Sequence, residues 1–165
     1  MDDAKGSLAA LRAAAEEEAI VKSRDDLNVG DIVYQCMDRS DGLVLNKGYD
    51  TRYKIFVIVG KKSNGEAVGM CLINSDLNYY KDNPERQKFQ YVIKKENYPD
   101  VAVLTKDSHL DCSKLFPMTA RKSVAMKAEI VGHLTQEDEA AIIPLVESCG
   151  FINEHLKKTY HIKQY

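Results

Sequence analysis

The most constraining feature of the sequence is a pair of apolar runs joined by a short polar turn. The segments YKIFVIVG (53–60) and AVGMCLIN (67–74) flank KKSNGE, which contains the pair Asn64-Gly65. An Asn-Gly pair between two apolar runs is typical of a tight hairpin, because both residues accept positive φ angles. The two runs are therefore predicted to be antiparallel neighbours in a sheet.

Other short apolar runs, separated by turn residues, continue this pattern along the chain. The pattern predicts strands over 31–37, 53–60, 66–74, 88–95, 100–104 and 109–116. Six short strands joined by hairpins and loops favour a small barrel or a strongly curved sheet, in an α+β fold that is mainly β.

Helices are predicted at both ends of this β-rich region. Residues 2–23 are rich in Ala, Glu and Leu and begin with Asp, which suits a helix with a thin apolar stripe. Near the other end, Thr135 can cap a helix that Pro144 would kink or divide and that Gly150 would end. Residues 151–165 suggest a further short helix with a loose, basic tail.

These elements predict three parts of the chain. They are an N-terminal helical extension (1–27), a barrel domain with a C-terminal helix (28–150) and a C-terminal helical tail (151–165). With 165 residues and a mass of 18.6 kDa, the chain is the size of one domain.

Composition excludes several classes of function. The formal net charge of −2 gives no global positive field for nucleic acid, although a local basic patch stays open. The four cysteines are spread singly, as in a reduced cytoplasmic protein, and no apolar run is long enough to span a membrane. Without a Gly-rich phosphate loop, an HExxH motif or clustered histidines, neither a cofactor nor a metal is predicted.

Arg52 and Lys54 are the first candidates for a binding site. They stand two residues apart where a predicted strand begins, so strand alternation directs both side chains to the same face. In a groove, this pair would hold a phosphate. The alternative is a pair of cations that protects an exposed strand edge from aggregation.

The stretch CLINSDLNYY (71–80) supplies the second group of candidates. Asn74 and Ser75 offer an amide and a hydroxyl at a strand end, and Tyr79 and Tyr80 could stack on unpaired bases. The same Asn, Ser and Asp residues are also usual in a plain turn that ends a strand.

His109 stands where another predicted strand begins, close to Asp107. Either residue is a candidate for proton transfer, and a surface position without a chemical role is the alternative. The segment 38–52 is too long for a tight turn, and long ordered loops in compact domains are often functional.

Three stretches, in order, resemble one family. They are VGDIVYQ (29–35), RYKIFVIVG (52–60), and the closing section that runs from KDSHLDCSKLFPMTARKS (106–123) through AEIVGHLTQEDEAAIIPLV (128–146). Over about residues 28–148 the chain resembles the MazF/PemK-like toxins of the Kid/CcdB superfamily. The resemblance implies a small SH3-like barrel followed by a helix.

The resemblance also implies a function. Family members are metal-independent endoribonucleases that cleave single-stranded RNA as homodimers and are inhibited by a protein antitoxin. Carried onto this sequence, the functional positions of the family fall on Arg52 or Lys54 and on Asn74 and Ser75. Together with the other candidates, the predicted site has Arg52, Lys54, Ser75 and His109 as catalytic residues and Lys47, Asn74, Tyr79 and Tyr80 as RNA-binding residues. Because RYKI replaces the Arg-Pro pair of the family and KLFPM follows the closing strand, the alternative is a non-catalytic module that binds RNA or protein.

Overall fold

The computed structural model describes residues 2–41, 48, 51–76 and 80–162. The helices are α1 (Asp2–Asp26), α2 (Pro84–Gln87), α3 (Ala120–Ala125), α4 (Gln136–Ser148) and α5 (Glu154–Thr159), with short 3-10 turns η1 (Arg39–Asp41) and η3 (Lys95–Asn97). The strands are β1 (Asp31–Asp38), β2 (Thr51–Lys61), β3 (Ala67–Asn74), β4 (Gln90–Ile93), β5 (Ser108–Asp111), β6 (Phe116–Thr119) and β7 (Glu129–His133).

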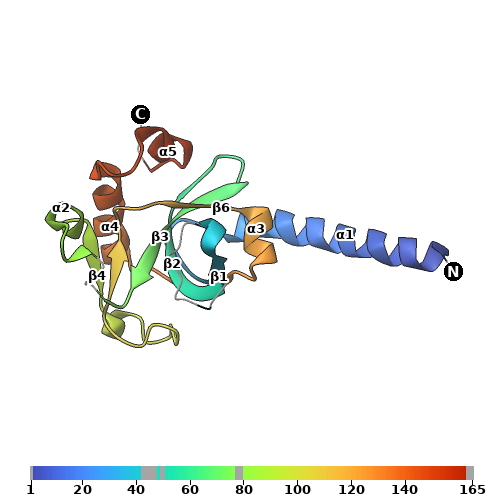
Figure 1. Ribbon diagram of the computed structural model, residues 1–165, viewed down its shortest axis with the longest axis horizontal. Coiled ribbons are helices and arrows are strands. Elements are labelled where there is room, and N and C mark those ends of the chain that lie inside the picture. Colours follow the sequence, from blue (N-terminus) through green and yellow to red (C-terminus); the bar gives the residue numbers. More distant parts are fainter. Residues whose placement is uncertain (1, 42–47, 49–50, 77–79, 163–165) are drawn as a thin grey trace.

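The seven strands form one curled antiparallel sheet that makes a half-barrel (Figure 1). Its order is β4-β5-β3-β2-β1-β7, and β6 also pairs with β3. β3 therefore has two neighbours on one side: its first half pairs with β6 and its last two residues pair with β5. This confirms the predicted α+β fold with a strongly curved sheet, an N-terminal helix and C-terminal helices.

The predicted hairpin joins β2 to β3. Gly65 adopts a φ of +71°, and its N–H donates to the carbonyl oxygen of Lys62 over 2.9 Å. The side chain of Asn64 accepts a hydrogen bond from the Glu66 N–H. The turn residues thus supply both the positive φ angle and the local hydrogen bonds that the hairpin requires.

Two of the predicted strands need correction, and one strand was not predicted. Residues 100–104 form turns rather than a strand, because Val101 and Leu104, three residues apart, both point into the core and donate to the carbonyl oxygens of Tyr98 and Val101. The predicted strand 109–116 is two strands, β5 and β6. The strand β7 lies on an edge of the sheet, and its residues are half-buried or exposed, so it lacks the apolar run used to find the others.

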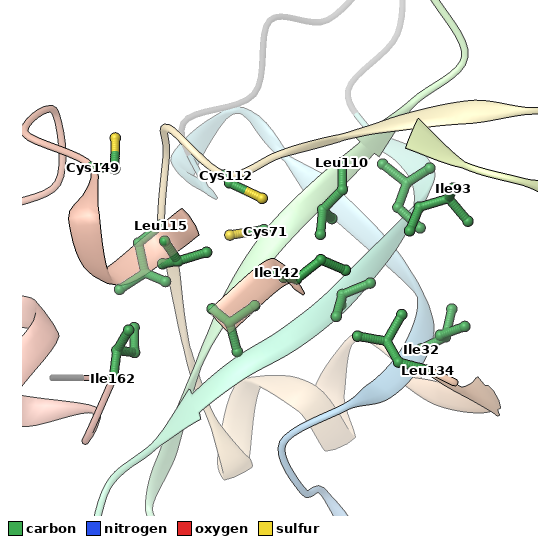
Figure 2. Packing of buried hydrophobic residues seen from close by; sticks show 14 of the residues in the cluster. Ile32, Cys71, Ile93, Leu110, Cys112, Leu115, Leu134, Ile142, Cys149 and Ile162 are labelled. Carbon is green, nitrogen blue, oxygen red and sulfur yellow. The ribbon is translucent and has the colours of Figure 1, made fainter. Parts of the chain in front are cut away.

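Each face of the sheet packs on its own hydrophobic cluster. Leu27 and the inward side chains of β1, β2, β3 and β6 form one cluster, which we call the inner cluster; it includes Val33, Phe56, Met70 and Met118. The opposite face packs against α4, α5 and residues 98–104 in the outer cluster. Figure 2 shows part of the outer cluster, in which Cys71, Cys112 and Cys149 come from separate segments of the chain.

Helix α4 begins as predicted. Thr135 is its N-cap and accepts a hydrogen bond from the Asp138 N–H. Asp138 is buried and accepts hydrogen bonds from the hydroxyls of Tyr91 and Tyr98, which fixes α4 to β4 and to the residue that ends η3. The bond to Asp138 raises the pKa of Tyr91 to about 12. Pro144 lies inside this helix and does not divide it, and the helix ends at Ser148, two residues before Gly150.

The C-terminal segment is not loose up to residue 162, which corrects the sequence prediction. Tyr160 and Ile162 are buried in the outer cluster, and the Lys61 N–H donates to the Tyr160 carbonyl oxygen over 2.9 Å. The backbone of Tyr160 lies so close to Gly60 that a Cβ at that position would be 2.6 Å from its oxygen. The segment therefore packs directly on β2.

Helix α1 extends away from the sheet, and only its last turns contact the rest of the molecule (Figure 1). The side chains of residues 4–18 are all exposed, whereas Ile20 is buried. Arg121 of α3 forms ion pairs with Glu16 and Glu17. No helix in the described part of the chain is both long enough and apolar enough to cross a membrane.

Candidate functional site

The predicted site residues of β2 and β3 meet at the end of the sheet that lies opposite the hairpin turn. Arg52 and Lys54 lie near the start of β2, and Asn74 is the last residue of β3. Ile55 pairs with Ile73, so the antiparallel register puts Lys54 beside Asn74, one step beyond the last paired residues.

This row of residues continues across the neighbouring strands. Lys54 pairs with Gln35 of β1, and Asn74 pairs with His109 of β5. Paired residues share a face of the sheet, and Gln35 contacts the sulfurs of Met37 and Met118 in the inner cluster. Gln35, Lys54, Asn74 and His109 therefore form one row on the inner face, which we call the polar row.

Arg52 stands next to the polar row. It precedes Lys54 by two residues, and its partner in β1 is Met37, so it lies on the same face. Partial burial, and then the positive charge of Arg52, lower the pKa of Lys54 below its ordinary value. Neither cation has a hydrogen bond or an ion pair with the described residues.

Gln35 adds a buried polar group to this row. Its side chain is 0 % exposed, and its Oε1 atom has no hydrogen-bond partner among the described residues. Its amide nitrogen lies 3.3 Å from the sulfurs of Met37 and Met118, which are weak acceptors. Next to the cation Lys54, the polar row therefore contains a buried acceptor that no described residue pairs with.

Ser75 belongs to the other face of the sheet. It lines an open cavity of about 200 Å³ together with Tyr34, Tyr53, Lys54 and Lys106. The rings of Tyr34 and Tyr53 are stacked, with centroids 5.1 Å apart, and Tyr53 is 49 % exposed. Lys54 is the one predicted site residue that belongs both to the polar row and to the wall of this cavity.

The remaining predicted residues lie elsewhere or outside the described part of the chain. Lys47 and Tyr79 are outside the described residues, as is most of the segment 42–50. Tyr80 is buried, donates to Asp111 over 2.7 Å and receives a hydrogen bond from Arg86. Asp107 accepts the Lys95 N–H, which gives its carboxylate a structural partner.

The sequence did not predict the site residues that strand pairing places beside Lys54. Gln35, Tyr34 and Tyr53 carry no motif, and their place beside Lys54 follows only from the pairing of β1 with β2. Lys106 comes from the turn before β5, where the sequence drew attention to its neighbours Asp107 and His109. Among the residues that the structure describes, no group of three or more His, Cys, Asp or Glu side chains could hold a metal ion.

Comparisons with known proteins show a likeness to solved structures. No family model matches the sequence, and no curated protein does. Among solved structures, the chain is similar to a crystal structure of MazE-MazF from Deinococcus radiodurans, with a TM-score of 0.47 and 11 % sequence identity over 74 % of this chain and 94 % of that chain.

Proposed function

We propose that the protein binds single-stranded RNA across the end of β2 and cleaves it without a metal ion, by attack of a ribose 2′-hydroxyl. This is the activity that the MazF/PemK resemblance implies. The observation that supports it best is the polar row, which aligns Lys54, Asn74 and His109 on one face, with Arg52 beside them.

RNA would bind on both faces of the sheet, at the polar row and at the Ser75 cavity, because Lys54 belongs to both. Arg52 and Lys54 attract the phosphate, the guanidinium as a two-pronged donor and the ammonium as a compact charge. The half-exposed ring of Tyr53, supported from behind by Tyr34, offers a flat surface on which an unpaired base stacks. Ser75 lies at the same cavity and can donate to or accept from a ribose or base.

The chemistry needs a base, an acid and donors for the phosphate oxygens. The neutral imidazole of His109 takes the proton of the 2′-hydroxyl, and the 2′ oxygen forms a bond to phosphorus. The bond between phosphorus and the 5′ oxygen breaks, and the leaving oxygen takes a proton from the Lys54 ammonium. The products are a 2′,3′-cyclic phosphate and a 5′-hydroxyl, and Arg52 and Asn74 stabilise the charged phosphate oxygens. The lowered pKa makes Lys54 a better acid than an ordinary lysine.

A second candidate function is binding of RNA without cleavage. It is favoured by the position of Ser75 and the tyrosine pair on the face opposite His109. A strand of RNA held mainly in that cavity would keep its phosphates near Lys54 and away from the imidazole.

The proposal includes the other implications of the resemblance. The protein would act in the cytoplasm as a homodimer, and a protein antitoxin would inhibit it. The three parts of the chain, 1–27, 28–150 and 151–165, would be an extension, the RNA-cleaving domain and a tail.

The test is cleavage of a labelled mixed RNA pool by the purified protein in the presence of a chelator. We expect fragments with 2′,3′-cyclic phosphate ends. The double variant Arg52→Ala/Lys54→Ala is expected to lose cleavage and binding together, whereas His109→Gln loses at least about a hundredfold in cleavage rate and keeps binding. Lys61→Ala, at the other end of β2, is the matched control.

The outcomes separate the two candidates. Binding that depends on Arg52 and Lys54, without cleavage, would replace the nuclease by the binding module. If the unmutated protein neither binds nor cuts the pool, both are wrong.

A further inference from the structure

A second cavity, separate from the polar row, lies between α2, the turn joining β5 to β6, and α5. Its volume is about 300 Å³. The residues that line it include two cations and four apolar side chains: Arg86, Lys114, Leu115, Phe151, Ile152 and Leu156. No carboxylate is among the described residues that line it. We call it the Arg86 cavity.

The guanidinium of Arg86 is held in place by two aromatic rings. It lies 5.4 Å from the ring centroid of Tyr80 and 4.8 Å from that of Phe151, and it donates to the Tyr80 hydroxyl over 3.2 Å. Both distances are within the range of a cation–π contact. The charged group is therefore fixed at the cavity before any ligand arrives, which lowers the entropic cost of binding.

The support behind Arg86 is a saturated buried carboxylate. Asp111 is 3 % exposed and accepts hydrogen bonds from the Tyr80 hydroxyl, the Gln90 amide, and both the N–H and the hydroxyl of Ser113. With its oxygens engaged in this way, Asp111 orients Tyr80 instead of pairing directly with Arg86. Tyr80, which the sequence suggested as a base-stacking residue, thus has a positioning role at this cavity.

Arg86 keeps donors for a ligand. A guanidinium has five N–H groups, and within the described residues only the bond to Tyr80 is made. No carboxylate of the described residues lies within ion-pair distance of it. On the other side of the cavity, the Lys114 ammonium lies 4.8 Å from the ring centroid of Phe116, which keeps a second positive charge near.

The charges and walls define the class of ligand. Arg86 and Lys114 line the cavity, and the carboxylate behind Arg86, that of Asp111, is engaged by Tyr80, Gln90 and Ser113. A carboxylate fits the two-pronged donor that Arg86 presents. The side chains of Leu115, Ile152 and Phe151 offer an apolar surface to whatever carries that carboxylate.

We propose that the Arg86 cavity binds a carboxylate attached to a small apolar body, with Arg86 as its bidentate partner. The carboxylate belongs either to a free organic acid or to the C-terminal residue of a peptide. This inference does not depend on the RNA proposal, because none of the lining residues belongs to the polar row or to the Ser75 cavity.

The experiment is an NMR titration of the full chain with N-acetyl-leucine and, as a neutral counterpart, N-acetyl-leucinamide. We expect the acid to shift backbone amide signals of residues 113–115 and 151–156 and the amide to leave them unchanged. Arg86→Gln is expected to weaken binding of the acid by about tenfold or more, as for loss of a hydrogen-bonded charge. A tripeptide ending in leucine and a free short-chain acid, 4-methylpentanoate, then distinguish the two sources.

Two further variants test whether binding depends on the charge of Arg86 and on the space in the cavity. Lys88→Gln, next to the same helix but paired with Glu85 on the surface, is the matched control and should bind like the unmutated protein. Leu156→Trp fills the cavity without removing a charge and should also abolish binding. Equal shifts by the acid and the amide, shifts by inorganic phosphate alone, or no shifts at millimolar acid would each overturn the proposal, as would undiminished binding by a folded Arg86→Gln protein.

Discussion

Lys54 is the residue at which function and stability oppose each other. Its side chain is half-buried, it faces the charge of Arg52, and its pKa is lowered for both reasons. A group held in an unfavourable charged state is a feature of functional sites, because the surrounding structure must compensate for it. The neighbouring Gln35, whose buried Oε1 atom has no hydrogen-bond partner within the described part of the chain, adds to this local cost.

We therefore predict that Lys54→Met stabilises the protein at pH 7. The expected rise in Tm is about 1 to 3 °C, which corresponds to less than about 1 kcal/mol for a chain of this size. Because the folded-state pKa is below the unfolded value of 10.5, the cost is fully present below the folded pKa and disappears as the pH rises toward 10.5. The gain should shrink over that range in thermal unfolding followed by circular dichroism.

Lys61→Met tests whether any lysine of β2 would behave in the same way. Its ammonium is a hydrogen-bond donor to the Asn28 side chain at the far end of the strand, so no gain in Tm is expected. A lower Tm for Lys54→Met would show that the charge of Lys54 stabilises the fold instead.

At the scale of elements, the sequence predicted the turns and helix starts that depend on a few neighbouring residues. Asn64-Gly65 was sufficient for the β2–β3 hairpin, and Thr135 for the start of α4. The strand β7 could not be found, because as an edge strand beside β1 it needs no continuous apolar run. Residues 100–104 were assigned wrongly since buried residues at the spacing of a turn resemble a short strand in composition.

The candidate site shows the same division between local and long-range information. That Arg52 and Lys54 share a face follows from strand alternation and was predictable. That His109 pairs with Asn74, or that Tyr34 stacks on Tyr53, depends on which strands become neighbours. Strand order is set by packing across the whole sheet, and no single stretch of the sequence records it.

Helix α1 allows a prediction about which residues the folded body needs. Removal of residues 2–18 should change the Tm by less than about 2 °C, because their described side chains are exposed and the ion pairs to Arg121 are on the surface. Removal of residues 2–27 should lower the free energy of unfolding by about 4 kcal/mol or more, since it also deletes buried Ile20 and Leu27. Urea unfolding of both truncated chains measures the difference.

This comparison also tests the boundary at residue 27. Equal stability of the two truncated chains would mean that the whole helix is an independent extension, as the sequence suggested. A large loss on removal of residues 2–18 would instead give the exposed turns of α1 a structural role.

At the scale of the whole molecule, the four cysteines report on the integrity of the core. Cys71, Cys112 and Cys149 are all 0 % exposed and come from β3, the segment after β5 and the end of α4 (Figure 2). Burial, together with the negative charge of Asp111, raises the pKa of the Cys71 and Cys112 thiols. Cys36 on β1 is half-buried and is the most accessible of the four.

We predict that one thiol reacts rapidly with Ellman's reagent at pH 8 in the native protein and that all four react in denaturant. The reagent needs a thiolate that it can reach, and the three core cysteines offer neither access nor, for Cys71 and Cys112, an easily lost proton. Their slow reaction in the native protein should follow opening of the outer cluster, so sub-denaturing urea should accelerate all three together. Cys36→Ser should remove the rapid phase and leave the slow phase unchanged. If two or more thiols reacted rapidly in the native protein, the sheet and α4 would not form the continuous core seen in the structure.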